Sequence, residues 1–209
     1  MISRFSLLLS LTLFTLLSIS QQRREVIDQH LFPQFAKGVI LFKNGVKREV
    51  FINYNKITEE LLVANGSVSI ALPNTENETI DTIYADGRKF VRLENKFLEV
   101  KYHSPSTTLF VEFKCKTITY TSTQYLNYGD QTDNYKTEDR LGTKNYNAEP
   151  FVVYWIKADQ TLFKVLRLKD LMKAFEKKKP LYKTYLKQHE VDFDDVEQVE
   201  EFVRYLDVG

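Results

Sequence analysis

The chain has little cysteine, glycine or proline and almost no net charge. Its 209 residues include one cysteine, seven glycines and five prolines, and the formal net charge at pH 7 is +1. A single cysteine excludes an internal disulfide, and the missing basic excess argues against a nucleic-acid partner. With 43% hydrophobic residues, the composition is typical of a globular chain that buries a core without cross-links.

Motifs that hold cofactors, metals or catalytic groups are also missing. The sequence has no Gly-x-Ser-x-Gly elbow, no phosphate-binding glycine loop and no dinucleotide-binding fingerprint. His30, His103 and His189 are far apart in the sequence, whereas a zinc site needs three or four converging ligands. We therefore predict no cofactor, no metal and no catalytic residue. Because 28 acidic residues leave any catalytic carboxylate pair unidentified, a glycan-acting hydrolase stays a third hypothesis.

The first twenty residues have the three zones of a signal peptide. Arg4 supplies a positive charge, residues 5–17 are mostly apolar, and Ser18 and Ser20 are small residues before Gln21. The apolar run is shorter than the ~20 residues that a membrane-spanning helix needs. We predict that residues 1–20 are removed near Ser20-Gln21, which leaves a periplasmic or secreted protein without a transmembrane anchor. An uncleaved N-terminal anchor is the alternative.

The middle of the chain has the pattern of antiparallel strands joined by tight turns. Asn44-Gly45, Asn65-Gly66 and Asp86-Gly87 each lie between short β-rich runs and favour two-residue hairpin turns. Strands are expected over residues 38–43, 47–53, 60–64, 67–72, 79–85, 89–93, 96–102, 107–121, 150–157 and 161–168. The predicted fold class is β-rich α+β, with residues 21–168 forming an antiparallel meander. The alternatives of a strongly curved sheet, a barrel and a sandwich stay open.

Residues 169–209 have helical periodicity, from which we predict about three short C-terminal helices packed on the sheet. Leu168, Leu171, Met172 and Phe175 recur at helical spacing. A second helix is expected to open at Pro180, because the missing N–H of proline costs nothing there. A third should begin after Asp195, which forms a capping-box pattern with Gln198.

Charge is segregated within this tail. Residues 164–187 contain nine basic side chains against Asp170 and Glu176, and residues 188–209 contain eight acidic side chains against Arg204. We expect antiparallel helices to bring the two halves together so that their fields cancel. The alternative is that the basic half contacts an anionic surface such as phospholipid or acidic glycan.

The segment 120–149 is the best candidate for a binding element. Loops longer than about 12–15 residues in compact domains often carry function. Tyrosines among short polar residues provide flat contact area at low entropic cost. The tyrosines of this segment are Tyr120, Tyr125, Tyr128, Tyr135 and Tyr146. The leading hypothesis is a non-enzymatic envelope protein that binds a partner protein or glycan through this loop and an open sheet edge. The alternative is a carrier that encloses a small apolar ligand in a curved sheet or barrel.

Several segments resemble a group of uncharacterised exported proteins of Bacteroidetes-type bacteria. The segments are residues 35–45, Ile52-Asn53-Tyr54-Asn55, Phe90-Val91, a strand pair near Tyr154, and the tail from Leu168-Lys169-Asp170-Leu171 through Val191-Asp192-Phe193 to Tyr205. The resemblance covers most of the chain after residue 20. It implies a periplasmic or envelope location and carries no activity or catalytic residue.

Overall fold

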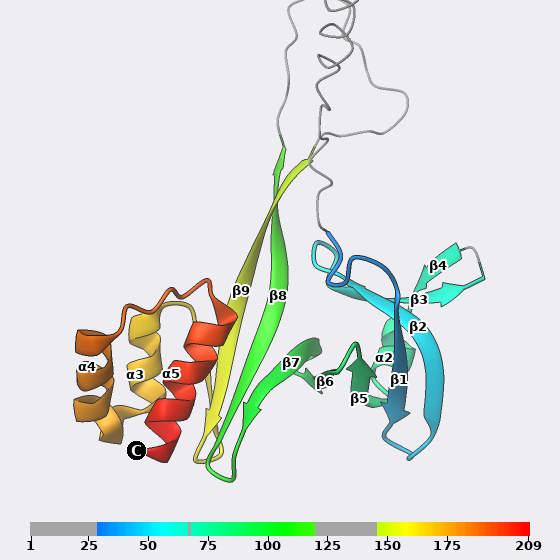
Figure 1. The fold of residues 1–209 in the computed structure, drawn as a ribbon. Helices are drawn as coiled ribbons and strands as arrows, with labels where there is room; N and C mark the ends of the chain where they lie inside the picture. Colours follow the sequence, from blue (N-terminus) through cyan, green and yellow to red (C-terminus); the bar gives the residue numbers. More distant parts are fainter. Residues whose placement is uncertain (1–28, 67, 120–145) are drawn as a thin grey trace, which may run out of the picture.

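The structure is a computed structural model, and it describes residues 29–66, 68–119 and 146–209 (Figure 1). Ten strands make up one antiparallel sheet, which confirms the β-rich prediction. The strands are β1 (Ala36–Phe42), β2 (Lys47–Asn55), β3 (Glu60–Asn65), β4 (Val68–Ala71), β5 (Ile80–Ala85), β6 (Arg88–Leu93), β7 (Lys96–His103), β8 (Thr107–Thr119), β9 (Tyr146–Ala158) and β10 (Thr161–Val165).

Positive backbone φ angles occur at the turns where the sequence predicts hairpins. Gly45, Gly66 and Gly87 all have positive φ, and Asp86 joins Gly87 in this conformation at 50°. Two consecutive residues of positive φ are the signature of the hairpin turn whose twist matches that of its strands. The turn between β9 and β10 uses the same conformation at Asp159 and Gln160, without any glycine.

The strand order is β10-β9-β8-β7-β6-β5-β1-β2-β3-β4. The sheet is open, with β10 and β4 at its edges, so the barrel and two-sheet alternatives are not met in the described residues. The path also differs from a simple meander, because the chain returns after β4 through the single-turn helix α2 (Asn74–Asn77) and pairs β5 with β1. This pairing places Ile83 opposite the buried Ile40. Since both side chains are then removed from water, the return to β1 is favoured.

Residues paired directly across antiparallel strands share a face of the sheet. The register therefore puts Ile83, Phe90, Glu99, Val111 and Tyr154 on one face, called here the inner face. The opposite or outer face carries Leu98, Phe110 and Trp155. The two faces differ in what covers them.

The C-terminal segment packs on the inner face of β8, β9 and β10, as predicted. Its elements are η1 (Leu168–Asp170), α3 (Leu171–Ala174), η2 (Glu176–Lys178), α4 (Lys179–Gln188) and α5 (Val196–Val208). Leu171 and Phe175 of the predicted apolar stripe do face the core. The backbone leaves helical geometry at Phe175, so the first expected helix is divided into the short elements η1, α3 and η2. Pro180 lies in the first turn of α4, as predicted.

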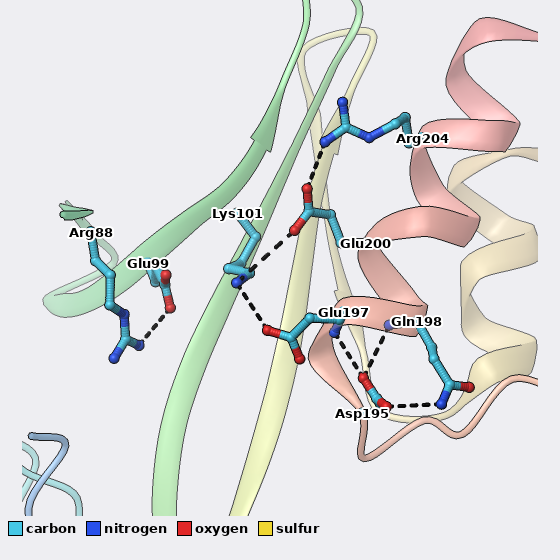
Figure 2. A network of polar contacts seen from close by, with 8 residues as sticks. All are labelled: Arg88, Glu99, Lys101, Asp195, Glu197, Gln198, Glu200 and Arg204. Atoms are coloured by element: carbon cyan, nitrogen blue, oxygen red, sulfur yellow. Dashed lines mark hydrogen bonds and ion pairs between the residues drawn. The ribbon is translucent and has the colours of Figure 1, made fainter.

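Asp195 caps α5, as predicted, although the capping box is only half formed. Its carboxylate accepts hydrogen bonds from the backbone N–H groups of Glu197 and Gln198, at 3.0 and 3.1 Å (Figure 2). The side chain of Gln198 does not return to the Asp195 N–H. Its Nε2 donates to the Asp195 carboxylate and its Oε1 accepts from the Asp192 N–H, so it ties the preceding loop to the helix instead.

Candidate functional site

The tyrosines singled out in the sequence belong to the segment that follows β8 and to the first residue of β9. Tyr120, Tyr125, Tyr128 and Tyr135 fall outside the described residues. Tyr146 is the first residue of β9 and pairs with Thr119 in the ladder, but its side chain is not described. The structure therefore leaves the proposed tyrosine contacts as a prediction. It does show that β8 and β9, at 13 residues each, run together up to both ends of this segment.

The outer face of β7, β8, β9 and β10 carries an apolar cluster that no described helix covers. Its buried members are Leu98, Phe110, Val153 and Trp155, which are between 1% and 8% exposed. Figure 1 shows α3, α4 and α5 together on one side of the β8–β9 hairpin, and their contacts are with the inner-face cluster. The accessible part of this face is therefore its perimeter, where the partly buried Phe151 and Leu162 and the exposed Lys157 and Lys164 surround the buried rings.

A buried carboxylate organises this outer face. Oε2 of Glu112 accepts a hydrogen bond from the indole N–H of Trp155 at 2.9 Å, and Oε1 accepts from the ammonium of Lys96 at 2.6 Å. Lys114 approaches the same Oε1 at 3.2 Å and also pairs with Glu59. Because Glu112 is 1% exposed, an unpaired charge here would be costly. The network therefore fixes the orientation of the indole ring.

The pKa values of this network follow from the same contacts. Burial alone would raise the pKa of the Glu112 carboxyl, but hydrogen bonds from Lys96 and Trp155 outweigh it and lower the pKa below its usual range. Burial alone would lower the pKa of the Lys114 ammonium. The hydrogen bond to Glu59 and the negative charge of Glu112 outweigh burial and raise this pKa. Glu112 and Lys114 are thus both held in their charged forms.

Lysines surround the aromatic side chains of the outer face. The ammonium groups of Lys164 and Lys96 lie 5.3 and 5.9 Å from the centre of the Trp155 ring, and that of Lys116 lies 5.0 Å from the Phe151 ring. Lysine stems cover apolar surface while their ammonium groups stay in water. Lys157, also on this face and exposed, adds to the positive rim. The arrangement suits a partner that is acidic at its periphery and apolar at its centre.

The inner face holds a second buried ion pair, between β6 and β7 and away from the helices. The guanidinium of Arg88 donates to Glu99 at 2.6 Å (Figure 2) and lies 4.9 to 5.3 Å from the rings of Phe32, Phe90 and Phe113. Glu99 is 4% exposed. Since Glu99 belongs to the inner face and Glu112 to the outer face, these two buried carboxylates do not face each other.

The turn after β2 approaches β8, and Lys56 of this turn lines an open cleft of about 470 Å³ together with Phe113 and Phe151. The backbone N–H of Cys115 donates to the Lys56 carbonyl at 3.0 Å. A separate cavity in the core is lined mainly by apolar side chains, among them Phe90 and Phe113, and has a volume of about 20 Å³. That is room for about one water molecule, so the interior is filled by the protein's own side chains.

The basic and acidic halves of the tail pack together but do not neutralise each other through ion pairs. Within the described residues, no ion pair joins residues 164–187 to the acidic side chains of residues 188–209. The carboxylates of Glu197 and Glu200 instead face Lys101 of β7, at 3.4 and 4.0 Å (Figure 2). The expected cancellation is therefore not found at the level of side-chain pairs, and the basic half keeps most of its charge unpaired.

The three histidines are separated in space as in sequence. His30 forms an isolated bridge with Asn55, His103 bonds Thr108, and His189 stacks on Tyr185. In the described part of the chain, no group of three or more His, Cys, Asp or Glu residues could hold a metal ion. No helix there is long and apolar enough to cross a membrane.

Sequence reasoning did not identify the outer face as a site. Apolar residues on both faces of the strands near Phe110 and Trp155 were interpreted as a hint of a carrier with an enclosed ligand, and a core covered by helices was the other explanation. The overlooked signal was Glu112, a carboxylate in the middle of an apolar strand, with Lys114 and Lys116 following at the same-face spacing. Comparisons of the chain with protein-family models, curated proteins and solved structures find no match.

Proposed function

We propose that this is an exported, non-enzymatic binding protein that captures a partner protein through the outer face of β7–β10. The observation that carries the proposal is the cluster around Trp155, which is apolar and aromatic, packs against none of the described helices, and has exposed lysines at its perimeter. Tryptophan is enriched among the residues that dominate binding energy, and charged residues at the rim set partner choice and association rate. The partner is a protein with an acidic surface around an apolar centre.

Export is the part of the proposal that rests on sequence alone. The charge, the apolar run and the small residues of the first twenty positions support a signal peptide. The partner would then be a protein of the periplasm or cell envelope.

We expect the tyrosine-rich segment to contribute to the same binding surface. It connects β8 to β9, the two strands that carry Phe110 and Trp155. A partner seated on the outer face near Phe151 would lie close to both ends of the segment, where tyrosines supply adaptable contacts. The open edge at β4 exposes Val68 and Ile70 and offers a further, smaller contact.

Two other functions have less support. A carrier of a small apolar ligand needs an apolar cavity, and the largely apolar space lined by Phe90 and Phe113 has about 20 Å³. The clefts of about 270, 470 and 670 Å³ are each lined in part by charged side chains. A hydrolase needs two carboxylates that face a common substrate. Glu99 and Glu112, the two buried glutamates, lie on opposite faces of the sheet and are each paired with a cation.

The test compares two charge variants of equal size. Lys157→Glu with Lys164→Glu reverses two exposed charges beside Trp155, and Lys43→Glu with Lys47→Glu reverses two exposed charges in the first hairpin as the control. Proteins cross-linked to the chain in its own cell envelope are quantified by mass spectrometry, and the candidate partner is then purified and titrated. We expect about tenfold weaker binding for the first variant, equivalent to ~1.4 kcal/mol, and unchanged binding for the control.

A third variant distinguishes the contribution of the outer face to binding from that of the tyrosine-rich segment. Replacing residues 122–143 by a short Gly/Ser linker should weaken the same partner while leaving the melting temperature close to that of the wild type. Loss of capture in both face and control variants, or equal capture by all variants, would reject the outer face as the binding surface.

A further inference from the structure

The surface formed by η1, α3 and η2 is strongly basic and has no function in the proposal above. The positively charged side chains exposed on it and on the start of α4 are those of Arg167, Lys169, Lys173, Lys177 and Lys179. This set is called the basic helical surface. It lies over the inner side of the sheet, whereas Lys157 and Lys164 belong to the outer face.

Few carboxylates oppose the charge of this surface. Asp170 is shared by Arg167 and Lys173, at 3.7 and 3.3 Å, and Lys177 lies 4.0 Å from the exposed Asp159. Glu176 is exposed on the same surface. Of the carboxylates of α5, Glu200 pairs with Lys101 and Arg204, and Asp207 is bonded by the hydroxyls of Ser106, Thr107 and Tyr102. A net positive potential therefore remains over the surface, and lysines at this spacing attract a ligand with repeated negative charges.

The surface is hollowed rather than flat. Two adjoining clefts, of about 270 and 670 Å³, share Phe163, Lys173 and Glu176 as lining residues. Phe163 is half-buried and lies between the clefts as their common aromatic wall. The smaller cleft is also lined by Asp159 and Asp207, so the excess of cations lies in the larger one, which is lined by Arg167, Lys169, Lys173 and Lys179. An aromatic side chain beside such cations suits a chain of sugar rings that carry acidic groups.

A membrane surface fits these features less well. Helices that lie on bilayers insert a stripe of large apolar residues. Over residues 161–190, Leu166 is the large apolar side chain with substantial exposure, at 57%. One such side chain is a small anchor, and the clefts would leave the lysines on their walls away from a flat bilayer.

We propose that the basic helical surface binds an acidic polysaccharide, with the lysines pairing its carboxylate groups and Phe163 packing against a sugar ring. This site is separate from the partner-binding outer face and stands independently of it. Binding should weaken steeply as salt rises from about 50 to about 300 mM, because the charges are exposed and screened.

The test titrates the purified chain of residues 21–209 with polygalacturonate, with polyphosphate and with vesicles containing phosphatidylglycerol. One variant carries Lys169→Gln, Lys173→Gln, Lys177→Gln and Lys179→Gln. The matched control carries Lys37→Gln, Lys43→Gln, Lys47→Gln and Lys89→Gln, which removes four exposed lysines from β1, β2 and β6. A third variant, Phe163→Leu, tests the aromatic wall and is checked for folding by its melting temperature.

We expect the wild type and the control to bind polygalacturonate alike, and the surface variant to bind about tenfold or more weakly. Phe163→Leu should weaken polygalacturonate binding several-fold and leave polyphosphate binding unchanged, because only the sugar chain offers rings to the aromatic wall. Equal binding by the surface variant and the control would overturn the proposal. Binding to the vesicles without binding to polygalacturonate would overturn it in favour of a membrane surface.

Discussion

Asp207, in the last turn of α5, shows how one carboxylate joins the helical tail to the sheet. It accepts hydrogen bonds from the hydroxyls of Thr107, Ser106 and Tyr102, at 2.5, 2.7 and 2.8 Å. Burial would raise the pKa of this carboxyl, but the hydroxyl donors outweigh it and lower the pKa to about 2. A negative charge at a helix C-terminus is disfavoured by the helix dipole. The hydroxyls, and Lys178, which donates to the Asp207 backbone carbonyl, offset that cost.

We expect Asp207→Asn to lower the free energy of unfolding by about 1–2 kcal/mol near neutral pH, because an amide cannot accept all three hydroxyl bonds as a carboxylate does. Since the pKa falls from 3.8 to about 2 on folding, the charge contributes fully above pH 3.8. This contribution is lost as pH falls through about 2. Urea unfolding at several pH values measures it. The gap between wild type and variant should shrink toward pH 2, and a gap independent of pH would contradict the linkage. Glu201→Gln, exposed on the same helix, is the control.

At the scale of elements, turns and stripes were readable from the sequence and long-range pairings were not. Asp86-Gly87 predicts its hairpin because few residues tolerate positive φ, and Asp195 predicts the start of α5 because its side chain accepts bonds from free N–H groups. The pairing of β5 with β1 had no local signal. It depends on burying Ile83 against Ile40, 43 positions apart in the chain.

The candidate site was predicted less well than the fold. Whether a face of the sheet is accessible depends on where the helices pack, and the local sequence does not give this. Apolar residues on both faces of β9, such as Trp155 and Ile156, indicate a covered strand. The three helices pack against Ile156 on the inner face. Trp155 lies on the outer face, where Lys164 packs over its ring. Equal and opposite charges in the tail likewise suggested mutual pairing, but Glu197 finds Lys101 on β7, nearly 100 positions away.

The N-terminal cap of α5 supports an element-scale prediction. Asp195→Ala should lower the free energy of unfolding by about 1 kcal/mol, because the N–H groups of Glu197 and Gln198 lose their acceptor. Asp194→Ala is the matched control, since the adjacent carboxylate does not cap the helix. Chemical denaturation followed by circular dichroism measures both. Equal losses in the two variants would show that charge, and not the cap, is responsible.

At the scale of the whole molecule, the sheet joins the two proposed binding surfaces on its opposite sides. A register shift between Val100 and Tyr102 leaves Lys101 unpaired in the ladder, and its ammonium reaches Glu197 and Glu200 of α5 (Figure 2). Trp155, the single tryptophan, lies on the far face of the same strands. The helices and the outer face are therefore supported by one layer of backbone. We expect the sheet and the tail to unfold as a single cooperative unit.

Phe202→Ala tests this cooperativity from the helical side. Phe202 is fully buried, and its ring lies 4.5 Å from that of Tyr185 and 5.2 Å from that of Tyr182. Removing such a ring costs about 3–5 kcal/mol through lost burial and the cavity left behind. Tyr205→Ala, a partly exposed aromatic on the same helix, is the control and should cost less.

The measurement compares Trp155 fluorescence with far-ultraviolet circular dichroism during urea unfolding of Phe202→Ala. One cooperative unit requires that both signals shift to the same lower midpoint, although Trp155 does not touch the mutated helix, because unfolding of the helices bares the inner face of β8, β9 and β10. That face carries Leu109, Val111, Tyr154, Ile156 and Val165. If fluorescence keeps the wild-type midpoint while circular dichroism splits into two transitions, residues 169–209 form a separate unit, and the outer face can bind its partner without them.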